Sequence, residues 1–293
     1  MRNLLHAVLR PLSIVHCCTL YFVLCTLYIV LLVSCTPKAD HLTILHTNDT
    51  HSQIEPKANG QGGYARRMGL IAEERKADPD LLLLDAGDFC QGTPYFNFYH
   101  GRVEIDAMNR MGYDAVTLGN HEFDNGLDTL AAVLRGAKFP VLCANYDFTG
   151  TALEKIVQPY TIIRRAGLKI GIFGLGCDPK GLIADKNFQP AVYRHPYAVA
   201  QQTADLLRAK NCDVVICLSH LGTYTKPGDG VCDVAMAQNT RGIDVIIGGH
   251  THQMYDCLRV ANLDGDSIPL CQMGKSGAYL GRIMLNLCDK TIK

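Results

Sequence analysis

Short apolar runs that alternate with polar loops dominate the chain from Leu42 onward. Their length and their branched side chains suit buried strands better than helices. The seven runs are residues 42–45, 81–84, 115–118, 141–142, 170–175, 214–218 and 245–247.

Four stretches between these runs have the spacing of helices. They are residues 64–76, 103–111, 127–135 and 197–209. This order predicts an α/β fold with helices outside central sheets. Residues 256–287 alternate as antiparallel strands do. No repeat or linker follows residue 40, so we expect one domain over 41–289.

The first forty residues have the pattern of an export signal. Arg2 and Arg10 precede an apolar run over 20–33, and no acidic residue occurs before Asp40. A basic start followed by an apolar stretch is typical of a secretory signal. The run ends at Cys35 in a segment that resembles the lipobox of bacterial lipoproteins. We therefore predict a signal peptide over 1–35 and a protein exported to the bacterial cell envelope and anchored in the membrane through a lipidated Cys35. An uncleaved membrane anchor is the alternative.

The charge balance and the cysteine content further limit the class of protein to which this chain can belong. Without Arg2 and Arg10 the chain holds 26 basic and 28 acidic residues, so it lacks the basic excess that binds long nucleic acids. Four of the 13 cysteines lie in the leader or at its end, and Cys143 and Cys217 lie inside apolar runs, as small core hydrophobes do. No CxxC pair supports a structural zinc cluster. An exported chain allows one or two disulfides, but the spacing assigns none.

Metal-binding side chains follow five of the predicted strands. Ligands of open α/β sheets bind beyond the carboxyl ends of the strands, where such loops meet. Carboxylate, amide and imidazole groups together suit Zn, Mn, Fe or a similar divalent ion. Strand alternation would also point Asp49 and His51 the same way, and likewise His250 and His252. Each residue alone has an ordinary explanation, such as a turn or a helix cap, but the ordered set favours a metal centre. The set is Asp49, His51, Asp88, Asn120, His220, His250 and His252.

Other polar residues have weaker signals. Tyr64, Arg66, Arg67 and Asn97 lie near the motif loops and are open to substrate contact, but we favour surface or packing roles for them. The remaining histidines lack a motif, and we interpret them as structural or solvent-facing. They are His6, His16, His41, His46, His100 and His195.

The ordered motifs resemble those of the calcineurin-like metallophosphoesterases. They are DxH from Asp49, GDxxQG over 87–92, GNHEFD over 119–124, the isolated His220 and GGHTH over 248–252. More narrowly, HTNDTH and GNHEFDxG resemble the bacterial and animal 5′-nucleotidases, including their 2′,3′-cyclic phosphodiesterase members. The match spans about residues 42–288 and implies a four-layer αββα sandwich with two divalent metal ions.

The resemblance also implies a role for each residue. One metal would be bound by Asp49, His51, Asp88 and His252. The other would be bound by Asp88, Asn120, His220 and His250, with Asp88 as the bridge. His121 and Asp124 match the catalytic pair of the family, in which the carboxylate orients the imidazole.

The expected reaction follows from such a centre. Two ions about 3.5–4 Å apart activate a bridging hydroxide and neutralise the phosphate oxygens, while His121 assists the transferring phosphoryl group or the leaving oxygen. We expect hydrolysis of phosphate monoesters, above all 5′-nucleotides. The alternatives are 2′,3′-cyclic nucleotides or sugar phosphates. A metal-binding partner subunit of a split nucleotidase is the non-enzymatic alternative.

One departure from the family concerns substrate selection. Exported 5′-nucleotidases usually carry a C-terminal domain that stacks the base, whereas this sequence ends at Lys293 and contains no tryptophan. We therefore expect either a separate polypeptide that supplies this domain, or an enzyme that acts alone with an open site.

Overall fold

The computed structural model describes Tyr21, residues 40–224 and residues 230–287. The segment Ala39–Lys293 is one compact unit. The predicted signal peptide and Cys35 lie outside the described residues, apart from Tyr21, so they stay predictions. Within the described part, none of the helices has the length and apolar character needed to cross a bilayer.

Five strands from the first half of the unit and the last strand, β14, build a six-stranded sheet in the order β14-β1-β2-β3-β4-β6. Five strands of this sheet run parallel to their neighbours, namely β1, β2, β3, β4 and β6. The sixth strand, β14, pairs with β1 in the antiparallel direction. Its members are β1 (His41–Thr47), β2 (Leu82–Asp85), β3 (Ala115–Thr117), β4 (Val141–Leu142), β6 (Val157–Gln158) and β14 (Gly281–Asn286).

The second half builds another six-stranded sheet in the order β12-β13-β11-β10-β8-β7. Its four central strands are parallel, and an antiparallel strand closes each edge. Its members are β7 (Tyr160–Arg165), β8 (Leu168–Leu175), β10 (Val214–Ser219), β11 (Val245–Gly248), β12 (Met254–Ala261) and β13 (Ser267–Met273). A small sheet pairs β5 (Tyr146–Asp147) with β9 (Val192–Tyr193).

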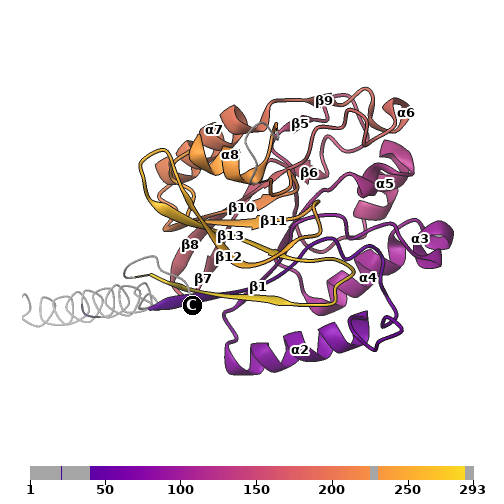
Figure 1. Ribbon diagram of the computed structural model, residues 1–293, viewed down its shortest axis with the longest axis horizontal. Helices are drawn as coiled ribbons and strands as arrows, with labels where there is room; N and C mark the ends of the chain where they lie inside the picture. The colour runs from indigo at the N-terminus through magenta and orange to yellow at the C-terminus, as the bar shows by residue number, and fades with distance from the viewer. Residues whose placement is uncertain (1–20, 22–39, 225–229, 288–293) are drawn as a thin grey trace, which may run out of the picture. The chain divides into compact units, whose positions relative to one another are not determined.

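Three apolar clusters show that the fold has four layers (Figure 1). One cluster joins the two sheets, because their facing strands are buried on both sides. The second lies between the first sheet and its helices, and the third between the second sheet and its helices. The predicted four-layer αββα sandwich is therefore confirmed.

The helices bury one face each, as their spacing predicts. In α7 the buried positions Ala200, Thr203, Ala204 and Leu207 follow the helical repeat of three and four residues. The helices beside the first sheet are α2 (Tyr64–Ala77), α3 (Pro94–Tyr99), α4 (Arg102–Met111), η1 (His121–Phe123), α5 (Gly126–Leu134) and α6 (Asp185–Phe188), and those beside the second are α7 (Pro196–Ala209) and α8 (Asp233–Gln238).

All seven predicted strands and all four predicted helices are confirmed. The antiparallel interpretation of the last part is also right, since β12 pairs with β13 and β14 with β1 in that direction. Sequence reasoning missed β7, because its residues are only half-buried and lack a continuous apolar run. It also missed the shortest elements, for which periodicity has too few residues to act on.

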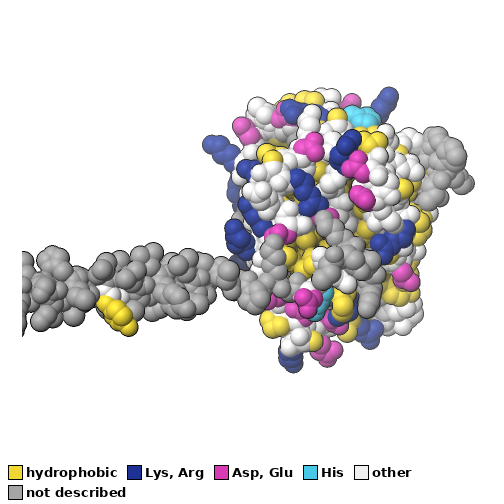
Figure 2. Space-filling model, turned by 90° about the vertical axis from the view of Figure 1, so that its left-hand side faces the viewer, with side chains coloured by type: hydrophobic (Ala, Val, Ile, Leu, Met, Phe, Trp, Pro, Cys, Tyr) yellow, Lys and Arg dark blue, Asp and Glu magenta, His cyan; other side chains and the backbone are white. Residues whose placement is uncertain are grey.

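The cysteines among the described residues divide into buried free thiols and one disulfide. Cys143 and Cys217 are buried free thiols, as predicted. Cys257 and Cys271 form a disulfide between the neighbouring strands β12 and β13. On the face shown in Figure 2, basic and acidic side chains are intermingled, so that face carries no extended field of one sign.

Candidate metal centre

Five loops that follow parallel strands bring the predicted site residues together. Three come from the first sheet, after β1, β2 and β3, and two from the second, after β10 and β11. Because both sheets end their parallel strands at the same edge of the sandwich, these loops meet there.

The backbone of these loops is unusual. Asp49, His51, Asp88, His250 and His252 all have φ between 46° and 73°, in the left-handed region. Such a conformation costs a non-glycine residue about 1–2 kcal/mol. Strain of this kind persists at sites where the side-chain position matters more than local stability.

This conformation corrects one argument from the sequence. β1 ends at Thr47 and β11 at Gly248, so neither pair lies on a strand. Strand alternation is therefore the wrong reason for the position of Asp49 beside His51. It also fails for the other pair, because His250 and His252 belong to different clusters.

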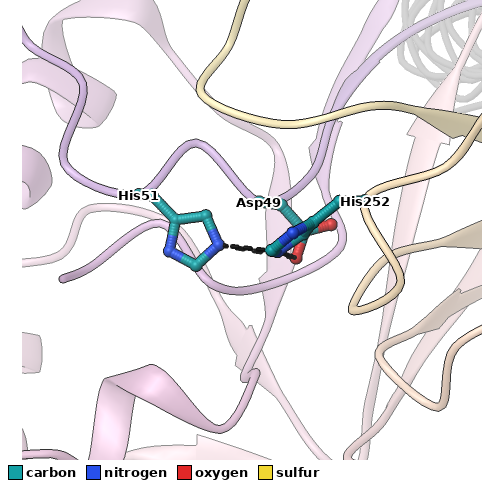
Figure 3. A group of neighbouring side chains, drawn as sticks. All are labelled: Asp49, His51 and His252. Carbon is teal, nitrogen blue, oxygen red and sulfur yellow. Dashed lines mark hydrogen bonds and ion pairs between the residues drawn. The ribbon is translucent and has the colours of Figure 1, made fainter. Parts of the chain in front are cut away.

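The first cluster consists of Asp49, His51 and His252. Their ligand atoms all lie within 4.8 Å of one another. His51 Nε2 lies 2.9 Å from His252 Nε2, and His252 Nε2 lies 3.5 Å from Asp49 Oδ1. The two imidazoles point toward each other over the carboxylate (Figure 3). Burial lowers the pKa of His51, which favours the neutral ring that metals require.

The second cluster consists of Asp88, His220 and His250, with Asn120 beside it. His220 Nε2 lies 3.0 Å from Asp88 Oδ2, and His250 Nδ1 lies 3.0 Å from Asn120 Oδ1. His220 Nδ1 donates to the carbonyl of Ala86 at 2.7 Å, which turns Nε2 toward the carboxylate. Carbonyl-anchored imidazoles of this kind are the usual form of metal-ligating histidine.

The electrostatics of this cluster favour a cation. Burial opposes protonation of His220, but the charge and hydrogen bond of Asp88 raise its pKa to about 10. Burial lowers the pKa of His250 to about 4, so that ring stays neutral. Asp49 Oδ1 also lies 3.9 Å from His220 Nε2, so two carboxylates surround this imidazole. A position that holds a proton so firmly also suits a divalent ion.

His121 and Asp124 lie beside both clusters. His121 Nδ1 lies 3.0 Å from Asp124 Oδ2, and both side chains are about one third exposed, at 32% and 34%. The backbone N–H of His121 donates to Asp88 Oδ1 at 2.8 Å, and the His121 ring lies 5.4 Å from that of His51. The hydrogen bond that the His121 ring donates to Asp124 is the main cause that raises the pKa of His121. The pair therefore presents an imidazole that retains its proton to higher pH.

Two glycines allow the close approach of these loops. A Cβ on Gly119 would overlap Asp88 Oδ1, and a Cβ on Gly249 would lie 2.8 Å from His220 Nδ1. Either substitution would displace a predicted ligand.

Sequence reasoning missed two residues that hold the loops. The buried carboxylate of Glu122 accepts hydrogen bonds from the backbone N–H groups of Asp88, Cys90 and Gly119, at 3.0, 2.9 and 2.6 Å. Asn48 donates to Asp49 Oδ2 at 2.6 Å and also accepts from the backbone N–H of Met273 at 2.8 Å. Both residues lie inside the sequence motifs that resemble the family. This position is the signal that could have identified them as residues of the site.

The other polar residues behave as interpreted. Tyr64 and Arg67 are buried, whereas Arg66 and Asn97 are exposed. Their predicted packing and surface roles agree with these positions. Of the remaining histidines, His41, His100 and His195 are exposed and His46 is buried, while His6 and His16 lie outside the described residues.

Comparisons with known proteins agree with this geometry. Residues 42–254 match the family described as calcineurin-like phosphoesterase. The rat 5′-nucleotidase is 34% identical over 284 residues, which cover 87% of this chain and 48% of the relative. A snake venom 5′-nucleotidase from Naja atra is 35% identical, over 85% of this chain and 51% of the relative. The chain thus spans about half the length of these curated relatives.

Solved structures give the same result. A 5′-nucleotidase precursor from Thermus thermophilus superimposes with a TM-score of 0.77 and 32% identity, over 86% of this chain and 53% of the other. The Haemophilus influenzae NAD nucleotidase superimposes with a TM-score of 0.74 and 30% identity, over 85% and 47%. The chain therefore belongs to the calcineurin-like phosphoesterase family, whose members are metal-dependent phosphoester hydrolases.

Proposed function

We propose that this chain hydrolyses phosphate monoesters, with 5′-nucleotides as the preferred class, at a centre of two divalent metal ions. The observation that carries the proposal is the convergence of the Asp49–His51–His252 and Asp88–His220–His250 clusters beside the His121–Asp124 pair. The family match and the nucleotidase relatives support the reaction type and the substrate class.

The donor set fits such ions. Buried oxygen and imidazole ligands surround two positions, and His220 Nε2 has no hydrogen-bond partner apart from its ion pairs with carboxylates. Zn, Mn, Fe or similar ions accept this mixture. Asp49, His51, Asp88 and His252 would bind one ion, and Asp88, Asn120, His220 and His250 the other. When bound, the ions would activate water and neutralise the phosphate oxygens.

The remaining steps belong to the chain's own residues. Asp124 holds the His121 imidazole through Nδ1 at 3.0 Å, which leaves Nε2 free to face a substrate. The raised pKa favours the protonated ring, which would donate a hydrogen bond to the transferring phosphoryl group or a proton to the leaving oxygen. The partial exposure of both side chains gives an ester access to this proton.

Substrate selection would need more than the described residues. This chain matches about half the length of its nucleotidase relatives. We propose that a C-terminal nucleotidase domain selects the nucleotide together with this chain, and that a separate polypeptide is one source of this domain. The alternative is an open site with wider selectivity, for which the relative named trifunctional nucleotide phosphoesterase in Bacillus subtilis is a precedent, at 32% identity. The motif resemblance to cyclic phosphodiesterase members makes 2′,3′-cyclic nucleotides a second substrate class to test.

We also propose that the protein is exported and held at the cell envelope through Cys35. The predicted leader and lipobox support this proposal. The Cys257–Cys271 disulfide supports it independently, because disulfides persist in oxidising compartments outside the cytosol. Metabolic labelling with a fatty-acid analogue tests it, with Cys35→Ala as the control that should lose the label.

Phosphate release tests the enzymatic proposal. Full chain with added Mn or Zn should hydrolyse AMP and p-nitrophenyl phosphate, and His121→Ala should reduce the rate about 10²–10⁴-fold without loss of metal. His195→Ala is the matched control, since that histidine is exposed and remote from the motifs. Comparison of 2′,3′-cyclic AMP with AMP decides between the two nucleotide classes.

The result that would overturn the proposal is metal binding without turnover of any ester, both alone and with a C-terminal nucleotidase domain added. The chain would then be a metal-binding subunit. Metal analysis of the purified protein identifies the ions.

A further inference from the structure

A second cavity lies away from the predicted metal ligands, between two exposed sheet edges. β14 is the edge strand of the first sheet and β12 that of the second. Both line a cavity of about 420 Å³, which is within the usual size of small-molecule sites. None of the nine predicted site residues lines it. The apolar part of its wall is formed by Met254, Met273, Leu280 and Ile283, with the ring of Tyr279 beside them.

One buried side chain in this cavity lacks partners. His46 of β1 is fully buried, and neither of its ring nitrogens has a hydrogen-bond partner. An unsatisfied buried polar group costs about 1–3 kcal/mol, so most such groups are paired. Gly281 makes room for the ring, because a Cβ there would overlap His46 Nε2. Burial lowers the pKa of His46 to about 4, so near pH 7 the neutral ring offers one donor and one acceptor.

The charged groups at the cavity favour an acidic ligand. Arg259 and Arg282 line it, together with the single carboxylate Asp256. Arg282 Nε pairs with Glu74 Oε2 at 3.0 Å, whereas Arg259 makes no ion pair with any described residue. A guanidinium without a partner matches the geometry of carboxylates and phosphates. Asp256 can accept a hydrogen bond from a polar substituent.

We propose that this cavity binds a small organic acid, with its carboxylate or phosphate group on Arg259, its apolar body against Met254 and Met273, and a polar substituent on His46. The site goes beyond the proposed phosphoesterase function and does not depend on it. Its walls are continuous with the metal loops, since Met254 follows His252 by two residues and Asn48 bonds to Met273.

Titration calorimetry on the full, metal-loaded chain tests the proposal with two probes, 4-hydroxybenzoate and phenylphosphonate. At least one probe should bind at one site, and benzyl alcohol, which lacks the acid group, should bind at least about tenfold more weakly. A response to only one probe identifies the acid group that the site accepts.

Two variants locate the binding. Arg259→Glu should weaken it at least about tenfold, because a charge-assisted hydrogen bond is lost. Arg164→Glu is the matched control and should leave the affinity unchanged, since this exposed arginine lies on β7 at the opposite edge of the same sheet. His46→Phe keeps the ring volume, removes the polar nitrogens and should weaken binding several-fold.

Three results would overturn the proposal. They are an absence of heat with both probes, an affinity that Arg259→Glu leaves unchanged, and equal binding of benzyl alcohol. If folded His46→Phe binds the probes with unchanged affinity, the imidazole of His46 does not contribute to ligand binding in this cavity. Because all readouts are binding affinities, their failure is separate from any failure of phosphate release.

Discussion

The space between the two sheets and the edge at which their strands end are both buried, yet they differ in chemistry. Between the sheets, Ile44, Leu84 and Ile216 are fully buried among other apolar side chains. A few residues beyond the ends of the same strands, Asp49, Asp88 and His220 are equally buried but ionisable. The side chains of the cluster between the sheets are apolar, whereas the edge gathers ionisable side chains and left-handed backbone.

This difference shows how the fold divides its tasks. The inter-sheet cluster supplies the apolar burial that stabilises the sandwich. The edge loops can then hold strained and charged residues, because the strands beneath them fix where each loop starts. Changes at the edge should therefore alter chemistry, and changes between the sheets should alter stability.

The largest effect is expected at Asp88, the carboxylate that contacts both clusters. Asp88→Asn should lower phosphate release by about 10³-fold, because it removes a charge from the proposed bridge. It should also lower the bound metal, measured by elemental analysis. Asp106→Asn is the control, since Asp106 is an exposed acid on α4 with a side chain 64% exposed. Full activity and full metal content in Asp88→Asn would contradict the view that the charged edge carries the chemistry.

Between the sheets the expected effect is on stability. Ile216→Ala should lower the free energy of unfolding by about 2–5 kcal/mol, because it leaves a cavity in a fully buried cluster. Urea unfolding measures this loss, and the folded fraction should keep its metal and its turnover. Leu206→Ala, at a position 43% exposed on α7, should change stability by less than about 0.5 kcal/mol. Loss of metal in folded Ile216→Ala would show that the two regions are not separate.

A smaller effect concerns pH. The pKa of His121 is raised above its ordinary value, chiefly by its hydrogen bond to Asp124, so the protonated ring persists to higher pH. If protonated His121 is needed, kcat/KM falls as pH rises through this raised pKa. Asp124→Asn removes the main cause, and the basic limb of the profile should then move to lower pH. If the basic limb does not move in Asp124→Asn, a titratable group other than His121 causes it.

The smallest effect is expected for backbone strain in a turn that lies outside the site, which can be compared with the backbone strain of the edge loops. Ala166, between β7 and β8, also has a left-handed φ of 53° but lies in no cluster. Ala166→Gly should raise the free energy of unfolding by about 0.5–1 kcal/mol, because relief of strain outweighs the added chain entropy. Gly167→Ala, at a φ of 72°, should do the opposite. Thermal unfolding measures both, and neither should change turnover.

Much of the fold was predictable because its signals are local. Buried parallel strands appear as continuous apolar runs, and the helices between them repeat every three to four residues, so an α/β fold with helices outside central sheets followed from the pattern. The four layers were implied by the family resemblance. β7 was missed because its half-buried residues carry no such run. The disulfide was missed because nothing in the spacing of Cys257 and Cys271 shows that their strands are neighbours.

By itself, the sequence determined which residues end the strands and which chemical groups they bring, since both are properties of short segments. The residue pattern alone did not decide how these groups combine. The family resemblance implied that His252 joins Asp49 and His51 while His250 joins Asp88 and His220, and the tertiary structure brings the same residues together. The reason is that left-handed loop residues, rather than strand alternation, aim these side chains. The structure also decided that His46 lies buried without a partner beside a cavity, because that depends on two sheet edges far apart in the sequence.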